Sequence, residues 1–152
     1  MDTVVRRAVP DDLAVLTELV AEYCQADGHR FDPVVARHGL EPLLTDDTYG
    51  AVWLIDPVEH HGSRAADGYI VVTWGWSIEI GGLDVVLDEF YVRSRGRGKG
   101  SDALEIIEGD CRRRGAKRIF LETEVANQRA RRLYERHGYQ ADTSIWMSKV
   151  LT

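Results

Sequence analysis

Cysteine, proline and long apolar runs are all scarce in this sequence of 152 residues. Its two cysteines, Cys24 and Cys111, form no CxxC pair and no Cys/His cluster, so we expect two small core residues and neither a disulfide framework nor a metal site. The 4 prolines and the lack of any low-complexity tract argue against a disordered or fibrous chain. No apolar run reaches the roughly 18 residues of a bilayer span, and the first residues lack the basic-then-apolar order of a signal peptide. We therefore expect a cytoplasmic protein without a membrane partner.

The composition is that of an ordinary globular protein. Apolar residues make up 44% of the chain and charged residues 29%, and a domain commonly holds about 100 to 200 residues. A chain of this length can bury a core without covalent or metal cross-links. One domain over residues 1–152 is expected.

The net charge of −6 conceals an asymmetry along the chain. Residues 93–136 hold 13 of the 19 Lys and Arg but only 7 of the 25 acids, whereas the rest of the chain carries 6 basic and 18 acidic residues. A cationic segment in an acidic body predicts one local site for a phosphate-bearing ligand and an anionic surface that attracts cations. The alternative is a set of solvated, arginine-rich helix faces.

Periodicity and punctuation predict alternating strands and helices. The expected strands are residues 4–8, 51–55, 69–77, 83–92 and 119–125, with one or two more in residues 139–151. The expected helices are residues 10–27, 34–44, 101–114 and 127–137. This β-α-α-β-β-β-α-β-α-β order predicts an α/β (α+β) mixed sheet, in which residues 83–125 form a parallel unit with a right-handed crossover. His60 and His61 fall in a loop without a partner at metal spacing and are expected in solvent.

The turn inside this parallel unit is rich in glycine and arginine, and we call residues 95–101 the glycine loop. Glycines there permit positive φ and a close approach to a ligand, and the amides of a helix N-terminus favour phosphate oxygens. The loop is therefore predicted to hold a pyrophosphate. Its candidate binding residues are Arg95, Gly96, Arg97, Gly98, Lys99, Gly100 and Ser101.

Other phosphate sites fit the loop less well. A triphosphate loop needs Ser or Thr directly after its lysine, but Lys99 is followed by Gly100. A nicotinamide fold places its glycine turn after the first strand of a βαβ repeat, which is not the position here. An arginine-glycine nucleic-acid segment would be longer and would not lie inside a periodic fold. An acyl-coenzyme A site remains, without nucleic acid as a partner.

Two stretches resemble motifs of the GNAT superfamily of N-acetyltransferases, in its small bacterial type. Residues 88–104, DEFYVRSRGRGKGSDAL, resemble motif A, and residues 127–139, NQRARRLYERHGY, resemble motif B. The resemblance implies the GNAT acyl-CoA N-acyltransferase fold, with acetyl-CoA as cosubstrate and no metal. The conserved arginine of motif A matches Arg95 or Arg97, and we favour Arg95 because it keeps Gly100 in a glycine position.

The chemistry of acetyl transfer points to further residues near the end of the expected strand 83–92. Transfer from a thioester to an amine needs a base for the amine and a donor for the developing oxyanion. Glu89 shares its strand face with Leu87 and Tyr91, and apolar neighbours raise a carboxyl pKa toward the range of a general base. The alternatives are a Glu89 that faces solvent or pairs with Arg93, and Glu122 or Glu124 as the base. The backbone of Phe90, Tyr91 and Val92 is expected to hold the pantetheine arm.

The resemblance adds two residues of motif B. It implies that Tyr134 is the general acid that protonates the departing thiolate, and that Asn127 binds the pantetheine amide. From the sequence alone, Tyr134 also fits a core tyrosine and Asn127 fits a helix N-cap.

These observations predict an N-acetyltransferase that transfers an acetyl group to a primary amine by direct attack in a ternary complex. An acetyl-cysteine route is disfavoured because neither cysteine has a paired base. The alternative is a GNAT-fold module that binds acyl-CoA without turnover. The acceptor is a small-molecule or peptide amine whose identity stays open, with His29 and Phe31 expected beside it; the oligomeric state also stays open, a homodimer included.

Overall fold

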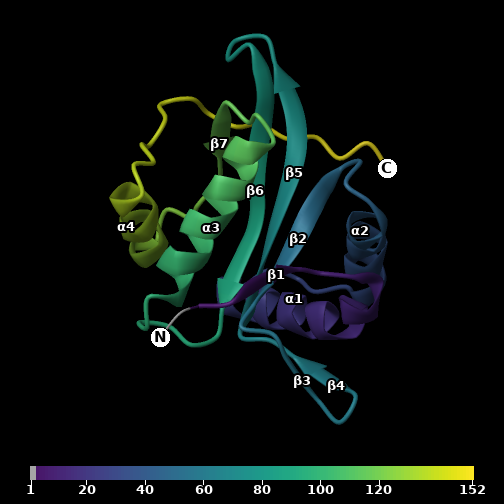
Figure 1. Ribbon diagram of the computed structural model, residues 1–152. Helices are drawn as coiled ribbons and strands as arrows, with labels where there is room; N and C mark the ends of the chain where they lie inside the picture. The colour runs from purple at the N-terminus through teal and green to yellow at the C-terminus, as the bar shows by residue number, and fades with distance from the viewer. Residues whose placement is uncertain (1–2) are drawn as a thin grey trace. The chain divides into compact units, whose positions relative to one another are not determined.

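The computed structural model describes residues 3–152 (Figure 1). The chain divides into two compact units, the first ending at Glu122 and the second spanning residues 123–152. A single domain over residues 1–152 stays a prediction.

The first unit is built on a five-stranded sheet. The strands are β1 (Val5–Arg7), β2 (Gly50–Ile55), β5 (Gly68–Ser77), β6 (Gly82–Val92) and β7 (Arg118–Phe120), in the spatial order β1-β2-β5-β6-β7. Neighbours pair antiparallel except β6 and β7, which are parallel. β2, β5 and β6 form an antiparallel meander, the predicted parallel unit is confirmed, and β6 lies inside the sheet.

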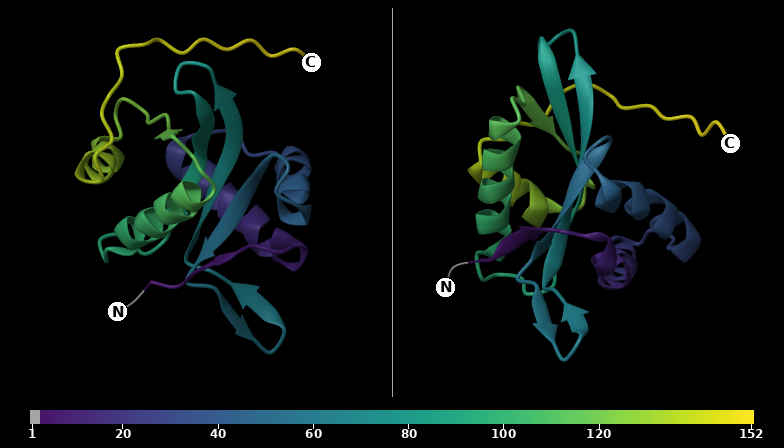
Figure 2. Two further views of the ribbon diagram at one scale, coloured as in Figure 1. Left: turned by 45° about the horizontal axis from the view of Figure 1, so that its top comes forward. Right: turned by 45° about the vertical axis from the view of Figure 1, so that its right-hand side comes forward.

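Helices lie on both faces of this sheet (Figure 2). On one face are α1 (Leu13–Asp27) and α2 (Pro33–Thr45), and on the other is α3 (Lys99–Arg113). α2 begins where Asp32 accepts a hydrogen bond from the Val34 N–H at 2.9 Å, which is a side-chain N-cap. The buried apolar residues on the α1 and α2 side include Val15, Leu16, Leu19, Val20, Leu40, Leu44, Val52, Leu54, Tyr69 and Val71. Those that α3 buries are Ala103, Leu104, Ile107 and Cys111.

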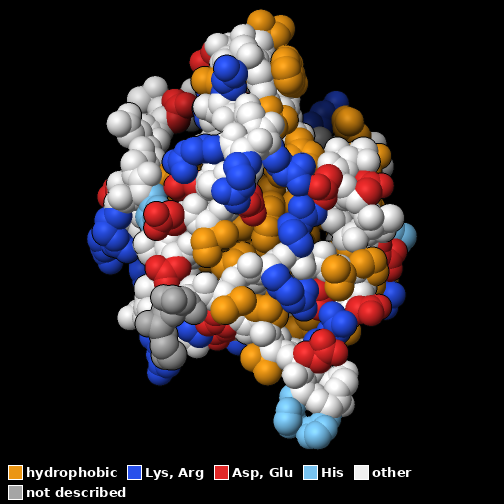
Figure 3. Space-filling view, in the orientation of Figure 1, with side chains coloured by type: hydrophobic (Ala, Val, Ile, Leu, Met, Phe, Trp, Pro, Cys, Tyr) orange, Lys and Arg blue, Asp and Glu red, His pale blue; other side chains and the backbone are white. Residues whose placement is uncertain are grey.

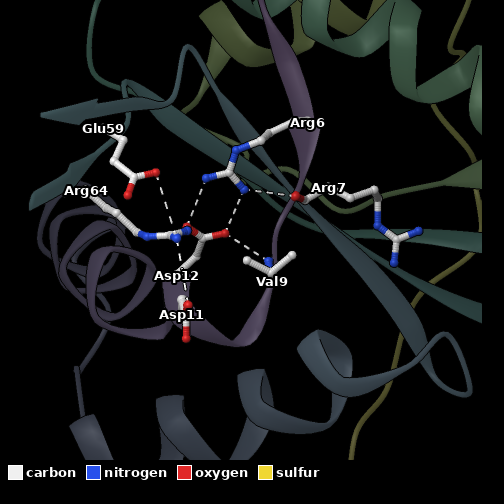
Figure 4. Close-up of polar contacts among 7 residues, drawn as sticks. All are labelled: Arg6, Arg7, Val9, Asp11, Asp12, Glu59 and Arg64. Atoms are coloured by element: carbon white, nitrogen blue, oxygen red, sulfur yellow. Dashed lines mark hydrogen bonds and ion pairs between the residues drawn. The ribbon is translucent and has the colours of Figure 1, made fainter. Parts of the chain in front are cut away.

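A fully buried carboxylate, Asp12, closes a short 3-10 turn, η1 (Pro10–Asp12), ahead of α1 (Figure 4). It accepts hydrogen bonds from Arg6 at 2.7 and 3.0 Å, from the Val9 N–H at 2.8 Å and from Arg64 at 2.9 Å. Burial would raise the pKa of Asp12, but these hydrogen bonds outweigh burial and lower the pKa to about 2. The carboxylate therefore fastens three segments together.

Arg64 belongs to a hairpin that the sequence did not predict, formed by β3 (Val58–His60) and β4 (Ser63–Ala65). Its strands are three residues long and mostly exposed, so they show no alternation of apolar and polar residues. Histidine side chains lie at its tip (Figure 3). His60 and His61 are exposed, as expected, with ring centroids 4.0 Å apart.

The second unit contains α4 (Gln128–Arg136) and an extended tail. The one or two strands predicted for residues 139–151 are wrong, because the described chain has no strand after β7. β7 is also shorter than the predicted 119–125. An alternating pattern makes a strand only where a neighbour supplies the ladder of hydrogen bonds, and the sequence does not reveal that neighbour.

Candidate active site

The glycine loop joins β6 to α3 as predicted, although the helix begins at Lys99, two residues earlier than expected. Gly96 and Gly98 have φ of 80° and 78°, a conformation that residues with a Cβ rarely adopt. A Cβ added to Gly98 would meet no atom within 4 Å, so the backbone there faces open space. The first helical amides point out of the helix beside this open backbone, which fits a bound pyrophosphate.

The positions of Gly96 and Gly98 bear on whether Arg95 or Arg97 matches the conserved arginine of motif A. In motif A the first glycine is the third residue after the arginine. Gly98 is the third residue after Arg95. Counted from Arg97, that place falls on Gly100, which lies inside α3. The backbone therefore favours the alignment on Arg95.

The side chains of the loop residues point to two different environments. Arg95 and Arg97 are exposed. The Lys99 ammonium instead lies 2.6 Å from Asp56 Oδ2 and 3.0 Å from Asp67 Oδ2. Lys99 was predicted to bind the phosphates, and within this geometry its backbone N–H is the group placed to do so.

The end of β6 is open on one edge. β7 pairs only with Asp84, Val85 and Val86 of β6, so among the described strands none continues on that edge of β6 toward the glycine loop. Phe90, Tyr91 and Val92 lie in this half-buried stretch. Their backbone groups on that edge are available to a ligand, as the prediction for the pantetheine arm requires.

A β-bulge changes which face of the sheet Glu89 occupies. Val72 pairs with Leu87 and Val71 pairs with Glu89, so Asp88 is an extra residue in β6. Glu89 therefore lies on the α1 and α2 face with Tyr91, but Leu87 lies on the opposite face. The expectation that Leu87 and Glu89 share a face is wrong, because the bulge reverses the alternation between them.

Glu89 has one short polar contact, with the Tyr69 hydroxyl, which donates to Glu89 Oε2 at 2.9 Å. Burial raises the pKa of Glu89, the hydrogen bond from Tyr69 opposes that rise, and the nearby Asp88 carboxylate adds to it. The raised pKa suits a general base. Catalysis by Glu89 stays a prediction.

Aromatic rings surround this carboxylate. The Tyr91 ring lies 6.4 Å from that of Tyr69 and 6.3 Å from that of Tyr23, and the Tyr23 ring lies 6.4 Å from that of His29. Tyr91 and His29 were singled out from the sequence, but Tyr69 was missed. Only the cross-strand pairing of Tyr69 with Tyr91 would have revealed it.

In the second unit, the predicted motif B residues are both on or next to α4. Asn127 is the N-cap, and its side chain accepts a hydrogen bond from the Ala130 N–H at 3.1 Å. The Tyr134 ring lies 5.6 Å from that of Tyr139. Their roles toward the coenzyme and the thiolate stay predictions, as do those of Glu122 and Glu124.

The cysteines match their expected character. Cys24 and Cys111 are free thiols, half-buried and buried. Burial raises the pKa of both, that of Cys111 to about 11.

Within residues 3–152, no group of three or more His, Cys, Asp or Glu side chains is arranged to hold a metal ion. In the same residues, no helix is both long and apolar enough to span a bilayer.

Comparison with solved structures identifies the fold. The chain superposes with a TM-score of 0.82 and 31% identity on the integron cassette protein HFX_CASS3, from the mobile metagenome of Cole Harbour Salt Marsh, covering 97% of this chain and 90% of that one. A possible acetyltransferase from Clostridium difficile 630 shares the fold, with a TM-score of 0.81 and 21% identity over 100% of both chains. The fold is thus that of acetyltransferases.

The family follows from the sequence match. The model of the Acetyltransferase (GNAT) family matches residues 16–139, and the chain belongs to that family. A relative, the uncharacterized N-acetyltransferase YhfO of Bacillus subtilis (strain 168), is 29% identical over 140 residues, which are 91% of each chain. The resemblance stated from the two motifs is confirmed.

Proposed function

We propose that this protein is an acetyl-CoA-dependent N-acetyltransferase that acetylates a primary amine by direct attack in a ternary complex. The observation that carries this proposal lies on one strand. β6 brings Glu89, with its raised pKa, within six residues of the glycine loop and its open helix N-terminus. A base and a pyrophosphate site joined by a strand with a free edge are the parts that this reaction needs.

In the proposed reaction each group of the chain has one task. Glu89 takes a proton from the acceptor amine, directly or through a water molecule, so that the nitrogen can attack the thioester carbonyl. Backbone groups of residues 90–92 hold the pantetheine arm, and one N–H donates to the oxygen that becomes negative. The C–N bond forms first, and the C–S bond breaks when the oxygen re-forms the carbonyl. Tyr134 gives its phenolic proton to the departing sulfur and regains one from the new amide nitrogen, which carries an extra proton after the attack.

We also propose that the acceptor is cationic before it loses its proton. The surroundings of Glu89 combine carboxylates with tyrosine faces, and both attract an ammonium group. Outside residues 93–136 the chain carries 18 acids against 6 basic residues, which attracts cations over a longer range.

The test is release of the coenzyme thiol, followed with a disulfide reagent, from acetyl-CoA in the presence of polyamines, lysine peptides, neutral amines and anionic amino acids. Release with cationic amines, lost in Glu89→Gln, is expected. Coenzyme binding without release for any amine would instead indicate a binding module without turnover. A preference for anionic acceptors would overturn the proposed acceptor charge.

A further inference from the structure

One carboxylate, that of Asp67, binds Ser94, just before the glycine loop, and Lys99 within it. Its Oδ1 accepts a hydrogen bond from the Ser94 hydroxyl at 2.8 Å, and its Oδ2 accepts one from the Lys99 ammonium at 3.0 Å. Ser94 and Lys99 flank residues 95–98, which contain both glycines of positive φ. The width of the loop is therefore set by a residue outside it, more than 25 positions earlier in the chain.

Asp67 is itself firmly placed. Its N–H donates to the Ile55 carbonyl at the end of β2 at 2.8 Å, and its carbonyl accepts from the Arg93 N–H at 2.7 Å. At the next residue, Gly68, an added Cβ would come within 2.2 Å of the Tyr91 carbonyl oxygen, so β5 and β6 approach each other closely there. The carboxylate thus stands on a rigid part of the sheet.

A second carboxylate completes the arrangement around Lys99. Asp56 has a φ of 45°, unusual for a residue with a side chain, and its Oδ1 accepts from the Val4 N–H at 2.8 Å. Its Oδ2 lies 2.6 Å from the Lys99 ammonium. The hydrogen bond from Lys99 to Asp56 and the weaker one to Asp67 both raise the pKa of the lysine, so it stays charged.

We propose that Asp67, assisted by Asp56, is a positioning residue for the coenzyme: through Ser94 and Lys99 it holds the glycine loop in the shape that receives the pyrophosphate. In this arrangement the Lys99 side chain is an anchor and not a phosphate ligand. Two carboxylates and one ammonium leave a net negative charge beneath the loop, so attraction of the phosphates falls to the backbone amides and to the exposed Arg95 and Arg97. The proposal rests on the proposed function, since it assumes that the loop binds coenzyme A.

Asp67→Asn separates this proposal from simple electrostatics. If Asp67 acts only as a negative charge near an anion, or restrains a lysine that would otherwise bind phosphate, removing the charge should tighten binding of coenzyme A. If Asp67 shapes the loop, the amide keeps only one acceptor oxygen and loses the charge, so it holds the Lys99 ammonium less strongly and must turn its N–H₂ group toward the Ser94 hydroxyl. The dissociation constant should then rise about tenfold, equivalent to about 1.4 kcal/mol.

Asp102→Asn is the matched control. Asp102 lies in the first turn of the same helix, and its carboxylate accepts from the Thr3 hydroxyl at 2.6 Å. Asp102→Asn removes one negative charge near the start of α3, as Asp67→Asn does, but leaves the contacts of Ser94 and Lys99 in place. Binding of coenzyme A should therefore be unchanged or tighter. Ser94→Ala, which removes one uncharged anchor with little risk to folding, should weaken binding in the same direction as Asp67→Asn, by about threefold.

Calorimetric titration with coenzyme A gives the dissociation constants, and turnover of S-acetylpantetheine supplies a readout that general damage would also move. That thioester lacks the pyrophosphate, so its kcat/KM should stay within about twofold of wild type in Asp67→Asn, while KM for acetyl-CoA rises about tenfold. Equal or tighter coenzyme binding by Asp67→Asn, or equal losses with both thioesters, would overturn the positioning role. Failure of the wild-type protein to bind coenzyme A would instead overturn the proposed function, and this role with it.

Discussion

The hydrogen bond between Tyr69 and Glu89 can be removed with a single oxygen atom, by Tyr69→Phe. The hydroxyl donates to Glu89 Oε2 at 2.9 Å and holds down a carboxyl pKa that burial raises. A hydrogen bond to a charged group contributes about 1.5 to 3 kcal/mol, and about 1.4 kcal/mol corresponds to one pH unit. If Glu89 is the base, the acid limb of the rate profile should therefore move about one to two pH units upward.

The assay is kcat/KM for one amine acceptor between pH 5 and 9, with acetyl-CoA saturating. The acceptor amine titrates as well, but identically for both enzymes, so the difference between the profiles reports the enzyme group. Tyr23→Phe, which leaves the hydroxyl of Tyr69 in place, is the control. An unshifted acid limb in Tyr69→Phe would refute the assignment of Glu89 as the base.

Glu89 also affects how the stability of the fold depends on pH. A group whose pKa is raised by folding favours the folded state below its unfolded pKa and loses that contribution as the pH rises through the folded value. Ionised Glu89 therefore destabilises the folded state at pH 8. Glu89→Gln should melt at a higher temperature than wild type at pH 8, with a smaller difference at pH 4.5, while its acetyl transfer falls. A lower melting temperature at pH 8 would contradict the direction of the pKa shift.

Three further results are expected. Gly98→Val should weaken coenzyme A binding by tenfold or more, about 1.4 kcal/mol, because valine resists the positive φ and fills the open space beside the helix amides; unchanged calorimetric affinity in the folded variant would place the phosphate site elsewhere. Tyr134→Phe should lower kcat by about 10² with little change in coenzyme affinity, and equal rates would make Tyr134 a packing residue. Asp12 has a pKa of about 2, below its unfolded value, so its contribution of about 2 to 3 kcal/mol should be present above pH 4 and lost between pH 4 and 2; denaturant unfolding of Asp12→Asn should show a flatter loss of stability over that range.

Much of the coenzyme site could be predicted from the sequence because its signals are local. Glycine spacing, the change from strand to helix periodicity and the two motifs lie within short stretches, and each fixes backbone conformation directly. The loop, the parallel unit and the N-cap at Asn127 were predicted for this reason. The family followed from the same residues.

The chemical surroundings of Glu89 depend on pairing between strands. The sequence placed Leu87 on its face, but the bulge at Asp88 puts Leu87 on the other face, and Tyr69 reaches Glu89 from 20 positions away. A bulge is set by the register of two strands, and no pattern within one strand reports it.

The sequence by itself determined where the glycine loop lies and which backbone conformations it needs, because glycine and helix-start preferences act over a few residues. The tertiary structure alone decided what holds that loop. The partners of Lys99 are Asp56, directly after β2, and Asp67, directly before β5. Both are distant from Lys99 in sequence, and they bind the ammonium group that was predicted to bind the phosphates. The tail shows the same division, since an alternating pattern states a preference for a strand, and only a neighbouring strand makes one.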